Sequence, residues 1–410
     1  MSLDAADVVV VGGGIVGVSA AYALKRRGFD VVLLEQRFLA YGASGRNSGC
    51  LWIQTMRGGP ALELARRGAE MYPGFVDVLG PTFEYRRNGG LFFYETQRQR
   101  ELFQRYAADR ERHGVSVELV EPDEARKLAP ALPDSALGAA YCPDDAQLST
   151  AKFVRGLGDA CRRMGVRVHE STPVLGLTRS REAVTGVRTV RGDVPAQAVV
   201  WTTGAWAKHL EAEGLSIPIN PVRVGLLMTQ PVHPKAQAIL RGPLGADSSS
   251  ALADLAEFRP GEFPTATDVE GQPLGYAEMV SATAEGSVQF GHVLDDPDAL
   301  NPHTTILAAK TMLDTLLSRR PDYAGLGVTG LWSGLVAGTP DGLPVIDRVD
   351  DLDGLHLATG HSFGNAAGPI SGELVAQSLA GEEPSMSLAP FALSRPALSG
   401  CPAGDVRLHW

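Results

Sequence analysis

The first fifty residues alternate between apolar runs and one amphipathic segment. Val8–Val11 and Val31–Leu34 are unbroken runs of branched apolar residues, which are typical of parallel strands buried on both faces. Between them, apolar residues recur at helical spacing from Val16 to Leu24, and Gly28 follows three cationic residues at the expected helix end. The pattern predicts a strand, a helix and a second strand parallel to the first.

A glycine turn joins the first predicted strand to the helix. Gly12, Gly14 and Gly17 fit the pattern G-x-G-x-x-G, which lets the backbone approach a pyrophosphate and directs a helix N-terminus at it. Glu35 closes the second strand, where a carboxylate accepts hydrogen bonds from an adenosine ribose and repels the 2′-phosphate of NADP. We therefore predict a dinucleotide site, the alternative being a glycine turn that binds no ligand. The predicted contacts are Gly12, Gly13, Gly14, Ile15, Val16, Gly17, Glu35 and Gln36.

Later segments repeat the α/β pattern. An amphipathic stretch from Phe153 to Met164 precedes extended segments, one of which contains Val174. Two apolar strands, Ala198–Trp201 and Leu355–Ala358, each end in a Thr-Gly turn. Because ligands bind at the carboxyl ends of strands in open α/β sheets, we expect these turns to join the glycine turn around one cofactor.

The segments in between have a different pattern. Leu91–Tyr94, Leu226–Thr229 and Ser287–His292 are aromatic or alternating runs, which are typical of a mixed or antiparallel sheet. The sequence therefore predicts an α/β protein, α+β overall, in which a second domain is inserted twice into the first. The first domain comprises residues 1–50, 150–215 and 331–384, the second 51–149 and 216–330, and a C-terminal tail 385–410.

Composition narrows the classes of function. The 410 residues include 37 Lys and Arg against 47 Asp and Glu, a net charge of −10 without a basic tract, which argues against a nucleic-acid or anionic-membrane partner. The cysteines have no CxxC spacing, which argues against a disulfide framework and a zinc site. We expect a cytoplasmic protein with no metal and no membrane span, whose partners are small molecules or proteins. The cysteines are Cys50, Cys142, Cys161 and Cys401.

Four motifs follow one another along the chain, namely Gly12–Gly17 with Glu35, Gly42–Gly49, Val199–Trp206, and Gly334–Ile346 with Gly360–Asn365. Together they resemble the FAD-dependent D-amino acid oxidase superfamily, which includes glycine oxidase, sarcosine oxidase and D-amino acid dehydrogenase. The resemblance covers about residues 7 to 382 and implies a Rossmann-like FAD-binding domain with an inserted substrate domain. The further flavin contacts that it implies are Ser44, Gly45, Arg46, Asn47, Ser48, Gly49, Val174, Thr203, Gly204, Trp206, Gly334, Leu335, Gly360, His361, Phe363, Gly364 and Asn365.

The resemblance also implies how the flavin is held. FAD is expected rather than FMN, because FMN has no second ribose for Glu35 to bind. The flavin is expected to be non-covalent, because Gly334 stands where monomeric sarcosine oxidases carry the attaching cysteine, and Cys50 is interpreted as a small buried hydrophobe. A helix expected to begin at Pro369 would direct its N-terminus at the flavin C2 carbonyl and N1.

Two positions depart from the relatives. Val336 stands where glycine oxidase and D-amino acid dehydrogenase relatives carry an arginine that pairs with the substrate carboxylate. Aligned through Gly291, Gln289 stands near the place of a lysine that is held to promote reaction with oxygen in sarcosine-oxidase relatives, and a protonated His292 is a substitute cation. Oxidase and dehydrogenase activities both stay open, with oxidase preferred because many relatives use oxygen.

The resemblance implies oxidation of a C–N bond. A neutral amine or amino acid would lose hydride to flavin N5, and the imine would hydrolyse to a carbonyl product. Tyr276 and Glu278 are two residues apart on one predicted strand and so share a face. Oxidation of a C–O bond in a hydroxy acid, a dehydrogenase subunit of a larger complex, and flavin binding without catalysis are the alternatives. The candidate pocket residues are Tyr276, Glu278, His292, Trp332, His361 and Arg57.

Overall fold

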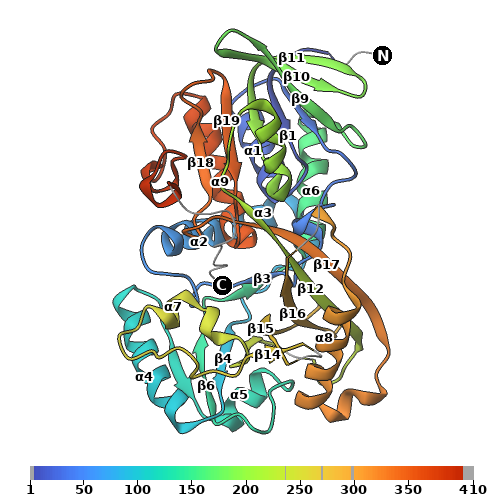
Figure 1. Cartoon of the computed structure of the whole chain (residues 1–410). Coiled ribbons are helices and arrows are strands. Elements are labelled where there is room, and N and C mark those ends of the chain that lie inside the picture. The colour runs from blue at the N-terminus through green and yellow to red at the C-terminus, as the bar shows by residue number, and fades with distance from the viewer. Residues whose placement is uncertain (1–3, 236, 269–270, 297–299, 400–410) are drawn as a thin grey trace.

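The computed structural model describes residues 4–235, 237–268, 271–296 and 300–399, whose strands form two large sheets, one in each half of the molecule (Figure 1). In the first sheet, β1 lies between β2 and β11 and runs parallel to both. β8 continues beyond β2, and β19 and β18 continue beyond β11. The strands are β1 (Ala6–Val11), β2 (Val31–Leu34), β8 (Arg167–His169), β11 (Gly192–Trp201), β18 (Val345–Arg348), β19 (Leu355–Thr359), and the ribbon β9 (Val174–Ser180) and β10 (Ala183–Thr189) on β11.

Helices cover one face of the first sheet, and alternate residues of β1 pack on opposite faces. Val8 and Val10 belong to the core beneath these helices, whereas Val9 and Val11 belong to the core on the other face. The helices approach closely: a Cβ on Gly372 of α9 would lie 2.5 Å from the Ala20 backbone nitrogen of α1. The helices of this half are α1 (Ile15–Arg26), α2 (Pro60–Glu70), α3 (Tyr72–Leu79), α6 (Thr150–Arg163) and α9 (Gly364–Leu379).

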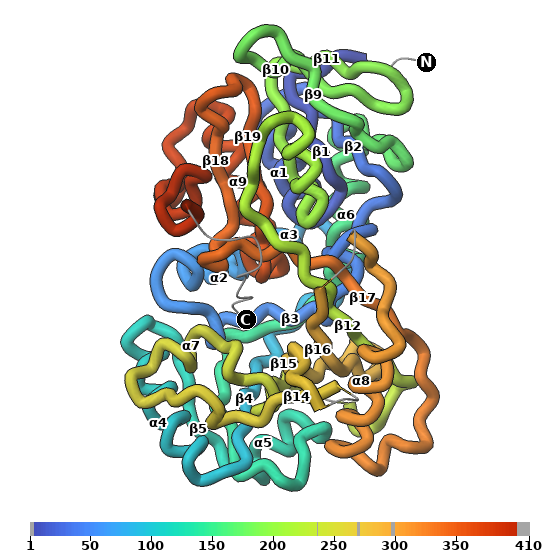
Figure 2. The backbone as a smooth tube through the Cα atoms, in the orientation of Figure 1, coloured from blue at the N-terminus to red at the C-terminus, as the bar shows by residue number. Residues whose placement is uncertain are grey.

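The second sheet is mixed. Strands β13 and β4 are parallel to each other, whereas the other pairs of neighbouring strands in this sheet are antiparallel. β12 and β17 are long neighbours that reach from the first half into the second (Figure 2). The strands in order are β17 (Val328–Gly338), β12 (Asn220–Pro231), β16 (Ser287–Asp295), β15 (Pro273–Ala282), β13 (Ile239–Arg241), β4 (Gly90–Tyr94), β6 (Gly138–Cys142) and β5 (Glu118–Val120), with β14 (Ala266–Thr267) beside β15. The remaining strands and α-helices of the described residues are β3 (Cys50–Leu51), β7 (Ala146–Gln147), α4 (Gln97–Arg112), α5 (Pro122–Leu128), α7 (Ser250–Ala253) and α8 (Ile306–Arg319).

Some segments lie in the other half from the one to which the sequence prediction assigned them. Residues 331–338 belong to β17 and pair with β12 of the second sheet. Helices α2 and α3 pack against α9 and α6 of the first half. Within the predicted tail, Arg395 forms an ion pair with Asp341, their Nε and Oδ2 atoms being 2.7 Å apart, whereas residues 400–410, with Cys401, lie outside the described residues. The division into two domains stays a prediction.

The last helix begins earlier than predicted. α9 starts at Gly364, so Pro369 lies inside the helix and not at its first position. Proline has no N–H, so it leaves the carbonyl four residues earlier, that of Asn365, without its helical donor. The Tyr72 hydroxyl donates to this Asn365 oxygen at 2.5 Å. A tertiary hydrogen bond therefore replaces the missing helical one, which is why proline does not end the helix here.

The described ranges contain no helix that is both long and apolar enough to cross a membrane. Over the same ranges, no three side chains from His, Cys, Asp and Glu gather closely enough to hold a metal ion.

Candidate functional site

One cavity extends from the carboxyl ends of β1, β2 and β11 to the second sheet. Its empty volume is about 1730 Å³, part of it open to solvent. Predicted cofactor contacts that line it are Gly12, Gly13, Gly14, Ile15, Val16, Glu35, Gln36, Ser44, Arg46, Asn47, Ser48, Val174, Thr203, Gly204, Trp206, Gly334, Leu335, His361, Phe363, Gly364 and Asn365. The predicted contacts Gly17, Gly45, Gly49 and Gly360 do not line it.

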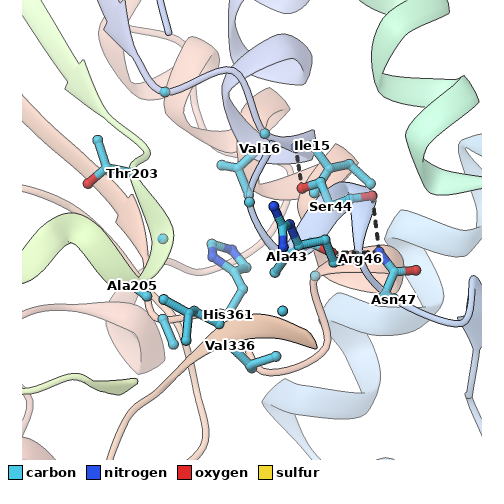
Figure 3. Close-up of a pocket in the computed structure, with 18 of the residues that line it drawn as sticks. Ile15, Val16, Ala43, Ser44, Arg46, Asn47, Thr203, Ala205, Val336 and His361 are labelled. Atoms are coloured by element: carbon cyan, nitrogen blue, oxygen red, sulfur yellow. Dashed lines mark hydrogen bonds between the residues drawn. The ribbon is translucent and has the colours of Figure 1, made fainter. Parts of the chain in front are cut away.

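The glycine turn is fixed by backbone sterics. Gly12 has a φ of 109°, in the region that favours glycine. A Cβ on Gly17 would lie 1.9 Å from the Gly12 carbonyl oxygen, so Gly17 permits the tight turn and makes no contact with the cavity. Ser44 accepts a hydrogen bond from the Ile15 backbone N–H at 2.9 Å, which ties the 42–49 loop to the first turn of α1 (Figure 3). The turn and this loop therefore form one wall of the cavity.

Glu35 lies at the carboxyl end of β2 and its carboxylate faces the turn. Its two oxygens accept from the Gly13 and Arg37 backbone N–H groups at 2.7 and 2.8 Å. Burial raises the pKa of this carboxyl above its ordinary value. Each oxygen keeps a second lone pair, so the carboxylate can still accept hydrogen bonds from ribose hydroxyls.

Asn47 and Asn365 hold the loop against α9. The Asn365 side-chain amide donates to Asn47 Oδ1 at 3.0 Å, and the Asn47 amide donates to the Ala43 carbonyl at 2.8 Å. The Gly49 N–H donates to the same Asn47 Oδ1 at 2.8 Å. These two residues line the cavity, and their side chains also lock the loop to the helix N-terminus.

Trp332 supports the cavity wall from outside. Arg46 lies over the Tyr41 ring, 5.0 Å from its centroid, and donates from Nε to the Tyr41 carbonyl at 2.9 Å. The Trp332 indole N–H donates to the Arg46 carbonyl at 3.2 Å, and Trp332 does not line the cavity. The structure therefore places Trp332 behind Arg46, not in a substrate pocket as predicted.

His361 lines the cavity in a defined tautomer. Its Nε2 lies 2.8 Å from the Ser371 hydroxyl oxygen, and the single proton of that hydroxyl is donated to the Ala367 carbonyl at 2.8 Å. The imidazole must therefore donate from Nε2, which leaves Nδ1 as an acceptor. Burial lowers the pKa of His361 to about 3, so the ring is neutral at pH 7. Figure 3 shows His361 and Val336 facing the same space.

Three polar groups of the cavity fit a ligand that can hydrogen bond. The Trp201 indole N–H and the Thr203 and Ser362 hydroxyls are buried, line the cavity and have no hydrogen-bond partner among the described residues. Buried polar groups in native proteins are generally satisfied, so these groups indicate a polar ligand. Together with the glycine turn and Glu35, they fit a dinucleotide cofactor.

Tyr276 and Glu278 do not face this cavity. The Glu278 carboxylate lies on the other side of the sheet, where it forms an ion pair with Arg319, Oε1 and Nε being 2.9 Å apart. Tyr276 is buried in the apolar core on that side. The two residues do share a face, as predicted, but Met279 and not Glu278 lines the cavity. Regular alternation places Tyr276 and Glu278 on one face of β15 and Met279 on the other, and no sequence signal tells which face meets the cavity.

Arg57 and Gln289 also lie outside the cavity. Arg57 forms a two-pronged, partly exposed ion pair with Asp254, with both donor–acceptor distances at 2.7 Å. The Gln289 carbonyl accepts from the Ser281 hydroxyl at 3.0 Å, and Gln289 is not a cavity residue. The comparison of Gln289 with the lysine of the relatives therefore stays a prediction.

His292 lines the second-sheet end of the cavity. Burial, together with the positive charge of Arg241, lowers the pKa of His292 to about 3. The ring is therefore neutral at pH 7, which argues against the expectation that it supplies a cation for oxygen reduction. The prediction missed Trp52, Met56 and Met279, which border the same end, because isolated apolar residues carry no sequence signal for a pocket.

The fold and the site define a class of protein, an oxidoreductase with a dinucleotide at the switch point of an α/β sheet. The chain belongs to the FAD dependent oxidoreductase family, whose model matches residues 7–378. It is therefore an FAD-dependent enzyme, and the residues around its cavity fit that cofactor.

The chain is similar to glycine oxidase from Geobacillus kaustophilus, with 27% identity over 402 residues that cover 95% of this chain and 97% of that protein. It is also 27% identical over 379 residues to the mitochondrial pyruvate dehydrogenase phosphatase regulatory subunit of Mus musculus, of which it spans 41%. Among solved structures, the glycine oxidase of Geobacillus kaustophilus has a TM-score of 0.81 at 24% sequence identity and covers 95% of this chain and 98% of that one.

Proposed function

We propose that the protein oxidises the C–N bond of an amine or amino acid, and that the imine then hydrolyses to a carbonyl compound and ammonia or a smaller amine. When bound, FAD supplies the hydride acceptor. The carbon loses a C–H electron pair as hydride, the nitrogen lone pair forms the C=N bond, and water then adds across it. The similarity to glycine oxidase over nearly the whole chain supports this reaction type.

The uncharged lining of one end of the cavity is the observation that best supports the proposal. The second-sheet end of the cavity is bordered by Val224, Leu226, Met279, Val336 and the neutral His292. An uncharged environment favours the neutral form of a substrate amine, and only the neutral amine has the lone pair that expels hydride. No nucleophile or metal is needed for this step.

The chain's residues orient the reactants and stabilise charge. The first turn of α9, including Gly364 and Asn365, lines the cavity, so the positive end of the helix dipole faces the cofactor's part of the site. His361 is held by Ser371 and presents a neutral acceptor nitrogen. The helix dipole needs no reorganisation as negative charge develops at the cofactor's part of the site, whereas the His361 nitrogen can accept a hydrogen bond from a bound ligand.

The products test the proposal. Purified protein is incubated with paired amino and hydroxy compounds of the same carbon skeleton, and carbonyl product and ammonia or amine are both quantified. We expect one nitrogen product for each carbonyl formed from the amino member. A carbonyl formed only from the hydroxy member would instead establish oxidation of a C–O bond.

The electron acceptor is a separate part of the proposal. We propose oxygen as the acceptor only because many relatives use it. His292 and Gln289 supply no cation to the cavity that would promote the reaction with oxygen. One hydrogen peroxide per substrate oxidised would support an oxidase. Slow peroxide formation with fast reduction of a quinone or dye would make the protein a dehydrogenase.

A further inference from the structure

Arg241 lies next to the second-sheet end of the cavity. It is the last residue of β13, where it pairs directly with Met279 of β15. Directly paired residues of antiparallel strands point to the same face of a sheet, and Met279 lines the cavity. The Arg241 side chain therefore occupies the cavity face, one strand beyond Met279 and two strands from His292 on β16.

The guanidinium of Arg241 is buried and poorly bonded. The residue is 0% exposed, and its Nε and Nη1 have no hydrogen-bond partner within the described ranges. Its Nη2 lies 3.5 Å from the Ser248 hydroxyl, and its Cζ lies 5.3 Å from the centroid of the Phe92 ring. Burial lowers the pKa of Arg241 to about 10, so the group is still charged at pH 7.

The buried carboxylate of Glu278 has other hydrogen-bond partners than Arg241. Glu278 stabilises the Arg241 charge at a distance, but its oxygens bond Arg319 and the Leu244 backbone N–H. Glu278 also lines a separate small pocket with Arg319 on the opposite face of the sheet. A buried charge without a bonded partner is costly in a folded protein. Its presence beside a cavity therefore indicates that the missing anion comes from a ligand.

Further polar groups lack partners in the segment that follows β13 and at the border of the cavity. The hydroxyls of Ser249 and Ser250 are buried without a hydrogen-bond partner among the described residues, and they follow directly on Ser248. The Trp52 indole N–H, at the border of the cavity, is also buried without a hydrogen-bond partner among the described residues. The free Nε and Nη1 groups of the Arg241 guanidinium match the several lone pairs of a carboxylate.

We propose that Arg241 binds the carboxylate of the substrate and so replaces the arginine whose position Val336 occupies. The inference rests on the proposed function, because it names the class of substrate for the same cavity. Met279 borders the cavity between His292 and Arg241, and its flexible side chain can move aside for a ligand. The substrate class is an amino compound with a carboxylate, larger than glycine, that extends past Met279 to β13.

The test uses the FAD-loaded protein and a carboxylate that cannot be oxidised. Benzoate is titrated into wild type, and the change in flavin absorption gives its Kd, with benzyl alcohol as the uncharged comparison. We expect benzoate to bind and benzyl alcohol to bind much more weakly. Arg241→Met should weaken benzoate binding roughly 30-fold or more, because the loss of a desolvated charge pair is large. Arg241→Lys should recover part of the affinity.

Thermal unfolding of the same variants separates binding from a structural role. In the absence of benzoate, Arg241→Met should keep or raise Tm, because it removes an unpaired buried charge. A structural arginine would instead give a lower Tm on substitution. Arg87→Met is the matched surface control, since Arg87 is an exposed arginine whose ion pair is with Asp144. It should leave benzoate affinity unchanged.

Several outcomes would overturn the inference. These are unchanged benzoate affinity in Arg241→Met, no benzoate binding to wild type, or loss of binding in Arg57→Met in place of Arg241→Met. If amino compounds still reduce the flavin in those cases, the proposed function stands and only the role of Arg241 is lost. If Arg241→Met loses benzoate but no amino compound reduces the flavin, the anion site stands and the proposed function fails.

Discussion

The Tyr72 hydroxyl donates a hydrogen bond to the main-chain carbonyl of Asn365 at 2.5 Å. The bond joins α3 to the first turn of α9, which lines the cavity. It satisfies the carbonyl that Pro369 leaves without a helical donor. The position of the helix N-terminus in the site is therefore coupled to a tyrosine that lies nearly 300 residues earlier in the sequence.

This coupling predicts a non-additive pair of substitutions. Tyr72→Phe leaves the Asn365 carbonyl buried without a donor and should lower the free energy of unfolding by about 1–3 kcal/mol. In a Pro369→Ala background the new N–H at position 369 can bond the same carbonyl, so Tyr72→Phe should cost clearly less. Urea unfolding of wild type, Tyr72→Phe, Pro369→Ala and the double variant gives the coupling energy between the two residues. Equal costs in both backgrounds would show that the two residues act independently.

The sequence predicted those parts of the fold that depend on local pattern. β2 coincides with the predicted Val31–Leu34, and the glycine turn with Glu35 was recognisable because its chemistry requires those residues at that spacing. The start of α9 was predicted wrongly, because the partner that compensates Pro369 is distant in sequence.

The substrate end of the site depends on strand pairing, which short patterns do not specify. Tyr276 and Glu278 were expected in the pocket, but both lie on the face of β15 that is turned away from it, where Glu278 lines a separate small pocket. Arg241 was not a candidate, because its closeness to the cavity comes from pairing with a residue 38 positions later. One-residue shifts of register reverse the facing of every side chain that follows.

Gly14→Val tests the cofactor site. A Cβ on Gly14 would lie 3.1 Å from the Ser44 hydroxyl oxygen, which accepts the Ile15 N–H, so a branched side chain should block the pyrophosphate and disturb the loop. We expect purified Gly14→Val to be colourless, whereas wild type should release one intact FAD on heating. Flavin content measured from absorbance after heat release checks both.

Gly74→Val is the matched control, because Gly74 lies on α3 with no atom within 4 Å of the position of its added Cβ. It should retain full flavin. Full flavin in Gly14→Val would show that the cofactor site is misplaced, and FMN in wild type would contradict the role of Glu35.

His356 on β19 predicts a pH dependence of stability. Burial lowers its pKa in the folded protein to about 4 from an ordinary value of 6.5. Between these values the unfolded chain binds the proton and the folded protein does not. The contribution of neutral His356 to the free energy of unfolding is therefore complete above pH 6.5 and is lost as the pH falls towards 4. His356→Gln should remove up to about 3 kcal/mol of this acid destabilisation.

The check is the free energy of unfolding at pH 7 and pH 4 for wild type, His356→Gln and the exposed-site control His303→Gln. The fall in stability between the two pH values should be smaller in His356→Gln alone. An unchanged fall would mean that the folded protein protonates His356 as readily as the unfolded chain does.

Val336 predicts poor turnover of small amino acids. It lines the cavity, and the resemblance to the relatives predicts a carboxylate-binding arginine at its place, so we expect glycine and D-alanine to be poor substrates. Val336→Arg should lower KM for glycine, since a desolvated carboxylate contact is worth about 2–5 kcal/mol. Val328→Arg, at an exposed valine of the same strand, is the control and should not change KM. Efficient glycine turnover by wild type would contradict the expectation.

Reduction of the bound flavin in the absence of oxygen tests the central claim most directly. The holoenzyme is mixed anaerobically with amino compounds and with hydroxy compounds of the same skeleton, and the visible absorbance of the oxidised flavin is followed. The account predicts rapid, complete bleaching by at least one carboxylate-bearing amino compound larger than glycine, and none by its hydroxy counterpart. Bleaching by the hydroxy compound alone, or by no amino compound, would contradict it.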